Sequence, residues 1–146
     1  MGWIEELRRR ASAAGHDETS AEDLFAEAAR QRWLLLGDEL RADVAEFNQR
    51  GQGAEFSRPE DDQYRIRNPK SGLELALTAD FDSRVVRYHY AALSGATAGV
   101  PDGGMLSIRQ SPRGAAEFYS ADERLTSEET RRVLLGPVLF PPQIVA

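Results

Sequence analysis

The chain has 146 residues, of which 41% are hydrophobic and 29% charged, and its formal net charge is −6. These values are ordinary for one globular domain that buries its own apolar core. The absence of cysteine excludes disulfides, zinc–thiolate centres and thiol catalysis, and the acidic balance argues against general nucleic-acid binding. No apolar run approaches the roughly 18–20 residues of a membrane span, and the charged N-terminus lacks a signal-peptide core. We therefore expect a cytoplasmic protein without membrane or nucleic-acid partners.

A short first helix and its linker are predicted over residues 1–19. The apolar residues of this helix share one stripe: Trp3, Ile4, Leu7, Ala11 and Ala14. Gly15 is placed to end the helix in a left-handed cap. Thr19 and Glu22 then match a capping box, which predicts that a second, long helix begins there and occupies residues 20–50.

The long helix has the most regular apolar pattern in the chain. Its apolar residues step by three and four, which keeps them on one face: Phe25, Ala29, Trp33, Leu36, Leu40, Val44 and Phe47. This helix would measure about 45 Å, whereas a domain of this size is only about 35–40 Å across. Either the helix bends at Gly37 or its first half projects beyond the sheet. Because one sheet cannot cover that first half, Leu24, Phe25 and Ala28 are predicted to pack against the first helix or to form a homodimer interface.

From residue 54 to residue 120 the apolar period changes from helical to alternating, and the segment is predicted to form a sheet. Turn residues separate the apolar runs at 59–62, 68–72, 80–83, 95–104 and 111–114. Most of these connections are too short to hold a helix, so the strands should pair as an antiparallel meander of five or six strands. Thr126 and Glu129 form a second capping box, which begins a C-terminal helix and tail over 126–140. The predicted fold is a two-layer α+β single domain, 1–146, with the helices covering one face of the sheet.

The alternation also assigns the two faces of this sheet. Eight apolar or aromatic side chains would point toward the helices: Tyr64, Ile66, Leu73, Leu75, Leu77, Val86, Tyr88 and Tyr90. Five basic residues would then share the outer face: Arg65, Arg67, Arg87, His89 and Arg109. Such a face could receive an acidic peptide or a phosphorylated ligand, or its cations could pair with neighbouring carboxylates such as Glu74.

No motif in the chain indicates catalysis or metal binding. The two histidines, His16 and His89, have no ligand spacing, and the acidic turns 59–62 and 80–83 do not match a calcium loop. The Gly-rich loop 99–104 lies between two predicted strands, whereas a phosphate loop lies between a strand and a helix. We therefore expect no catalytic residues, no metal and no cofactor.

The sequence favours a small non-catalytic protein-interaction or chaperone-like module, working as a homodimer or with a protein or acidic-peptide partner. The expected architecture is similar to that of small secretion chaperones, which place helices over an antiparallel sheet. The alternative is a small-molecule-binding protein or enzyme, with a pocket between helix and sheet near Tyr88 and Tyr90 and the 99–104 loop as its lid. A closed interior would favour the first hypothesis. An open cavity lined by tyrosine hydroxyls and His89 would favour the second.

Overall fold

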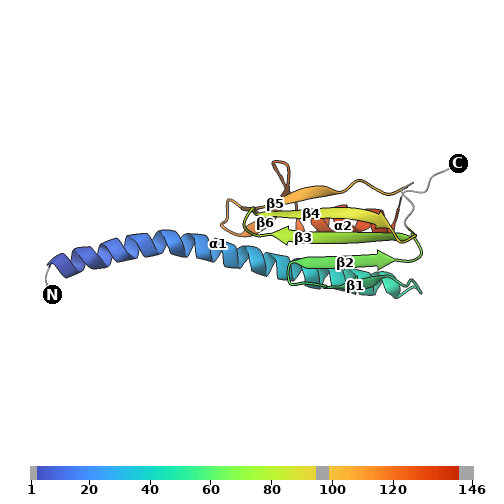
Figure 1. The fold of residues 1–146 in the computed structure, drawn as a ribbon, viewed down its shortest axis with the longest axis horizontal. Coiled ribbons are helices and arrows are strands. Elements are labelled where there is room, and N and C mark those ends of the chain that lie inside the picture. The colour runs from blue at the N-terminus through green and yellow to red at the C-terminus, as the bar shows by residue number, and fades with distance from the viewer. Residues whose placement is uncertain (1–2, 95–98, 142–146) are drawn as a thin grey trace.

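The computed structural model describes residues 3–94 and 99–141, and for residues 5–21 it describes the backbone alone. The elements follow in the order α1 (Trp3–Asn48), β1 (Glu55–Ser57), β2 (Gln63–Asn68), β3 (Leu73–Asp80), β4 (Val85–Ala92), β5 (Gly104–Gln110), β6 (Ala116–Ser120), β7 (Glu123–Arg124) and α2 (Ser127–Leu139). The predicted α+β class is confirmed, with a long N-terminal helix, an antiparallel sheet and a C-terminal helix. Figure 1 shows α1 running along the body and then well beyond it.

The seven strands in the described part of the chain form one sheet, in which every strand pairs with its neighbours in sequence. All six pairings are antiparallel, which confirms the predicted meander. The additional strand is β7, whose two residues are too few for an alternating pattern to reveal. It forms a hairpin with β6 through a tight turn in which Ala121 adopts a positive φ of 54°.

A single helix replaces the two helices predicted at the N-terminus. α1 runs unbroken for 46 residues, through both Gly15 and Thr19, and is about 69 Å long. Glycine inside a helix costs only about 1 kcal/mol relative to alanine, and the Ala-, Arg- and Glu-rich flanks favour helix on both sides. A capping box stabilises the start of a helix but does not require the helix to start there, so the helix start predicted at Thr19 was wrong. No helix in the described part of the chain is both long enough and apolar enough to cross a membrane.

The same pattern at Thr126 is a true helix start. The Thr126 Oγ1 atom accepts a hydrogen bond from the Glu129 N–H at 3.1 Å, and Glu129 Oε1 accepts one from the Thr126 N–H at 3.1 Å. Here the chain enters α2 directly from β7, so the first backbone N–H groups of α2 need the hydrogen-bond partners that this capping box supplies.

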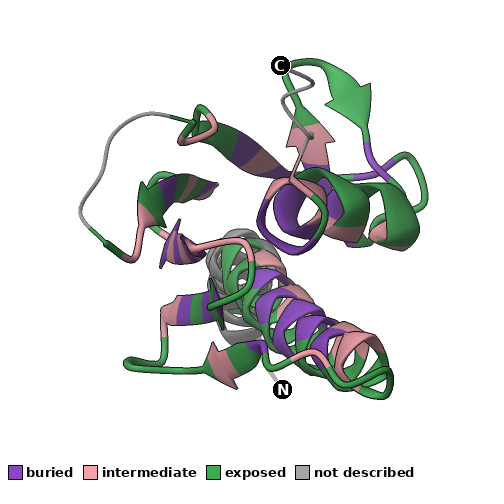
Figure 2. Cartoon of the chain, turned by 90° about the vertical axis from the view of Figure 1, so that its right-hand side faces the viewer, coloured by how far each residue is buried: buried purple, intermediate pink, exposed green. Residues whose placement is uncertain are grey.

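The core lies between the sheet and the two helices. Viewed from the end in Figure 2, the sheet curves around α1 and α2, which lie side by side. α1 contributes a buried stripe of Ala29, Trp33, Leu36, Leu40 and Val44, and the sheet contributes its predicted inner face, including Ile66, Leu75, Leu77 and Val86. Phe25 and Phe47 pack at the two ends of this stripe, so the body covers α1 over about 35 Å and the first half projects.

Gly37 lies in close contact with a strand residue. A Cβ atom at position 37 would lie 2.4 Å from both Cζ and the hydroxyl oxygen of Tyr64. The Tyr64 ring stacks on Trp33 with centroids 4.1 Å apart, and its hydroxyl donates to the Trp33 carbonyl at 2.7 Å. Glycine is therefore required here for close packing between α1 and β2, in a helix that continues through it.

Candidate functional site

The five basic residues predicted for the outer face of the sheet all lie there and are exposed. Strand register places Arg65 opposite Ala76, and Ala76 opposite His89. Arg65 and His89 thus line one shallow hollow of about 230 Å³, together with Glu74, Ala76 and Ala91. The remaining three residues, Arg67, Arg87 and Arg109, lie outside this hollow.

Carboxylates neutralise much of this basic face. The three ion pairs are Arg65 with Glu74 at 2.7 Å, Arg87 with Asp80 at 3.4 Å and Arg109 with Asp122 at 3.2 Å. Pairs this exposed contribute at most about 1 kcal/mol each, but they reduce the positive potential that would attract an anion. The geometry therefore resembles the ordinary solvated face that the sequence left open as an alternative, and binding of an acidic peptide stays a prediction.

The tyrosines of the alternative pocket have structural contacts. The Tyr90 hydroxyl donates to the Leu134 carbonyl at 2.8 Å, which ties β4 to α2, and burial raises the pKa of Tyr90 above its usual range. Burial likewise raises the pKa of Tyr64 to about 12. Tyr88 is half-buried on the same inner face, whereas His89 points outward, so His89 cannot share a cavity with them. A pocket near Tyr88 and the loop stays a prediction, and residues 95–98 lie outside the described residues.

The acidic turn at residues 80–83 stabilises its own hairpin. Asp80 Oδ1 accepts a hydrogen bond from the Ser83 N–H at 3.1 Å, and this bond lowers the pKa of Asp80. The described residues hold no cluster of three side chains suited to a metal ion. The turn thus has the local role that such Asx residues commonly play.

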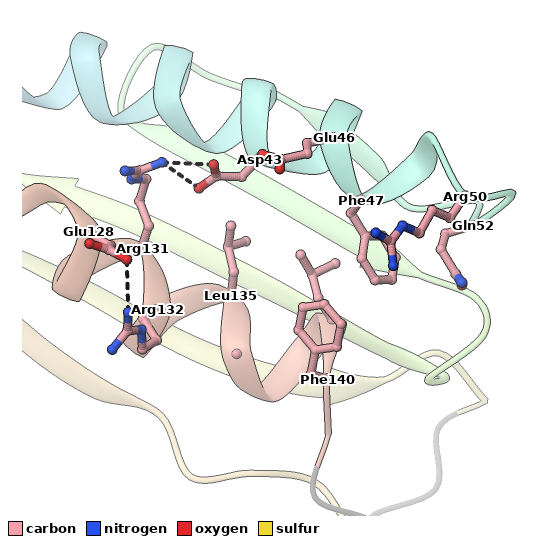
Figure 3. A pocket seen from close by; sticks show the side chains of 12 residues that line it. Asp43, Glu46, Phe47, Arg50, Gln52, Glu128, Arg131, Arg132, Leu135 and Phe140 are labelled. Carbon is pink, nitrogen blue, oxygen red and sulfur yellow. Dashed lines mark hydrogen bonds and ion pairs between the residues drawn. The ribbon is translucent and has the colours of Figure 1, made fainter.

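A groove of about 670 Å³ runs between the C-terminal part of α1 and α2 (Figure 3). One end is apolar, where the rings of Phe47 and Phe140 meet edge to face with centroids 5.3 Å apart. The other end is charged, and Arg131 Nη1 donates to both carboxylate oxygens of Asp43 at 2.8 and 3.0 Å. Sequence patterns do not reveal this groove, because its walls come from two separate helices, on which Asp43 and Arg131 lie 88 residues apart along the chain.

Glu39 joins the two helices beside this groove. It accepts hydrogen bonds from Arg32 Nη1 at 3.0 Å and from the Ser127 hydroxyl, and Arg131 Nε lies 3.8 Å away. Burial raises the pKa of Glu39, but the bonds from Ser127 and Arg32 outweigh it and hold that pKa below its usual value. At Asp43 burial dominates and raises the pKa, although the Arg131 guanidinium partly offsets it.

We expect the Glu39→Gln substitution to lower the free energy of unfolding by about 1 kcal/mol at pH 7. A carboxylate whose pKa is lowered by folding contributes stability above its unfolded value of 4.5, and this contribution is lost as the pH falls through the folded value. The difference between the variant and the parent protein should therefore shrink below pH 4.5. Urea unfolding between pH 7 and pH 3 measures it.

The matched control is Glu128→Gln, which breaks an exposed pair with Arg132 on α2. It should change the free energy of unfolding by less than about 0.5 kcal/mol. A Glu39→Gln effect that is the same at every pH would show that the carboxylate charge is not what stabilises this contact.

The projecting part of α1, Trp3–Leu24, is the surface that most distinguishes this molecule (Figure 1). Trp3, Ile4 and Leu24 are 69%, 56% and 65% exposed. Of the three residues predicted for a dimer interface, only Leu24 has this exposure. Phe25 and Ala28 pack partly against the chain's own core, and the Arg84 guanidinium lies 4.4 Å from the centroid of the Phe25 ring. The packed part of α1 is thus longer than predicted, and the dimer itself stays a prediction.

Comparison with known proteins gives no relative. No protein family, no curated protein and no solved structure is significantly similar to this chain. The features that bear on function are therefore those of the molecule itself: the outer sheet face, the groove and the projecting helix.

Proposed function

We propose that this protein is a non-catalytic interaction module that binds a helical segment of another protein molecule through the projecting part of α1, Trp3–Leu24. The observation that supports this function is the length of the helix. α1 is about 69 Å long, and the body covers it only from Phe25 to Phe47. The backbone of the remaining length, about 33 Å, projects beyond the body in Figure 1.

Helices in proteins are stable chiefly because they bury an apolar face, so a long uncovered helix gains much from a partner. The described apolar side chains of the projecting part, Trp3, Ile4 and Leu24, are at least half exposed. Covering them would contribute about 25 cal/mol for each Å² of apolar surface removed from water. An amphipathic helix suits this surface, because its own apolar stripe can follow α1 along its length.

Site-specific photo-crosslinking tests this proposal in the organism's own cells. A photoreactive residue at position 24 of the full chain should give a discrete cross-linked product. The control position is Met105, which is 53% exposed on the outer face of the sheet and should give none. The product should also disappear when Trp3→Glu and Ile4→Glu are introduced together. A product of twice the chain mass would identify a second copy as partner, and any other mass would identify a different protein.

Either kind of product supports an interaction module that uses the projecting helix. If position 24 gives no product, or the same products as position 105, the projecting helix has no partner and the proposal fails. Circular dichroism of each variant, recorded beforehand, must show the helix content of the parent protein.

A further inference from the structure

A second surface of α1, on its packed half, carries a distinctive arrangement of charges. It consists of Glu27, Arg30, Leu34, Asp38 and Arg41, which we call the Leu34 face. These residues step by three, four, four and three, which places them along one side of the helix. All five are exposed, and Leu34 is 45% exposed at the centre, beside Leu35 at 52%. The face points away from the buried stripe that contains Trp33 and Leu36.

None of the four charged residues of the Leu34 face forms an ion pair with another residue of the described part of the chain. The two arginines are instead held over aromatic rings. The Arg30 guanidinium lies 5.0 Å from the centroid of Phe81, and that of Arg41 lies 5.1 Å from the centroid of Phe56. Such cation–π contacts hold each guanidinium near its ring and leave its N–H groups able to bind a carboxylate.

The signs of these charges are opposite at equal distances from Leu34. Arg30 and Asp38 lie four residues before and after it, and Glu27 and Arg41 lie seven residues before and after it. In an antiparallel pair of identical helices centred on Leu34, a residue a given number of positions before Leu34 in one copy lies opposite the residue the same number of positions after Leu34 in the other copy. Arg30 would then meet Asp38 of the second copy, and Glu27 would meet Arg41. Two-fold symmetry doubles these contacts and places four opposite-charge pairs around two central leucines.

We infer that the Leu34 face binds a second copy of this chain, antiparallel, with the two-fold axis at Leu34. A parallel pair would oppose Arg30 to Arg30 and Asp38 to Asp38, which like-charge repulsion disfavours. A face that binds an unrelated protein must complement the charges of that protein. Only a two-fold contact between identical chains requires a face whose charges complement one another. An apolar centre with a charged rim is also the usual anatomy of a protein interface. The five residues of the Leu34 face lie outside the projecting segment Trp3–Leu24, so the inference does not rest on the proposed function.

Light scattering of the full chain at two protein concentrations and low salt tests this inference. The parent protein should be dimeric at the higher concentration, and Leu34→Glu should make it monomeric. Arg30→Asp and Asp38→Arg, each alone, should raise the dissociation constant at least tenfold, since each places like charges opposite one another. An equimolar mixture of these two variants should dimerise again, because the charges are complementary across the mixed dimer.

Two controls separate this surface from the projecting helix. Leu24→Glu should leave the dimer intact even if it abolishes cross-linking at the projecting segment, and Arg87→Asp on the outer sheet face should also leave it intact. Circular dichroism must show that every variant retains its helix content. The inference is overturned by a parent protein that is monomeric at both concentrations, by a dimer that survives Leu34→Glu, or by a mixture of the charge variants that stays monomeric.

Discussion

Trp33→Ala should lower the free energy of unfolding by about 3–5 kcal/mol, as expected for the loss of a large, fully buried aromatic side chain. Trp33 is 1% exposed and is the largest side chain in the core. It stacks on Tyr64, and its indole Nε1–H donates to the Asp61 carbonyl at 2.9 Å, which ties α1 to the turn before β2. The substitution would leave a cavity and would remove one of the two hydrogen bonds that the Asp61 carbonyl accepts, the other coming from Arg58 Nη2 at 2.9 Å. Urea unfolding followed by circular dichroism measures the change.

The matched control for Trp33→Ala is Tyr64→Phe. This variant retains the stacked ring but removes the hydroxyl that donates to the Trp33 carbonyl at 2.7 Å. It should cost only about 1 kcal/mol, the usual contribution of one hydrogen bond. If Trp33→Ala cost no more than this control, the body would not depend on α1 for its core, and the helix would be an attached rather than an integral element.

Gly37→Ala should lower the free energy of unfolding by about 1–3 kcal/mol, although alanine is the better helix former. Two effects oppose each other at this position. Alanine favours the helix by about 1 kcal/mol, but its Cβ would lie 2.4 Å from the ring and hydroxyl of Tyr64. That ring is stacked on Trp33 and buried, so it cannot move aside without disrupting the core. The steric effect should therefore dominate.

The control for Gly37→Ala is Ala45→Gly, at an exposed position of the same helix. It should cost about 1 kcal/mol, which measures the helix propensity without a packing contribution. Combining Gly37→Ala with Tyr64→Leu should give a smaller loss than the sum of the two single changes, because the clash is then absent. A Gly37→Ala variant more stable than the parent would show that the glycine serves no packing role.

The spacing of apolar residues predicted the helices and strands well wherever burial decides which residue type occupies a position. The stripe from Phe25 to Phe47 is packed against the body, and the alternation of β2 to β4 assigns their two faces as observed. The break near Gly15 was wrong because start and stop signals are weak preferences. They decide a helix end only where the chain must also turn, as it does at Thr126.

The candidate surfaces were less accessible to sequence reasoning. The outer-face arginines could be assigned from alternation, and Glu74, which pairs with Arg65, could be named as a neighbouring carboxylate. Asp122 could not, since it reaches Arg109 only through the β6–β7 turn. The groove depends on the packing of α2 against α1, which no local pattern encodes. The symmetric charges around Leu34 are visible in the sequence. They indicate an interface only once the structure shows that this side of α1 is exposed.

The order of synthesis places the whole of α1 ahead of everything that covers it. Every strand pairs with its sequence neighbour, so the sheet can form by successive local hairpins. α1 differs, because it packs against β6, which ends about 70 residues after the helix is complete. At about 5–20 residues per second, the ribosome needs roughly 4–14 seconds to supply that strand. During this interval the stripe from Phe25 to Phe47 is exposed on every nascent chain. Folding in the cell therefore depends on preventing this apolar stripe of α1 from aggregating before the sheet has been synthesised.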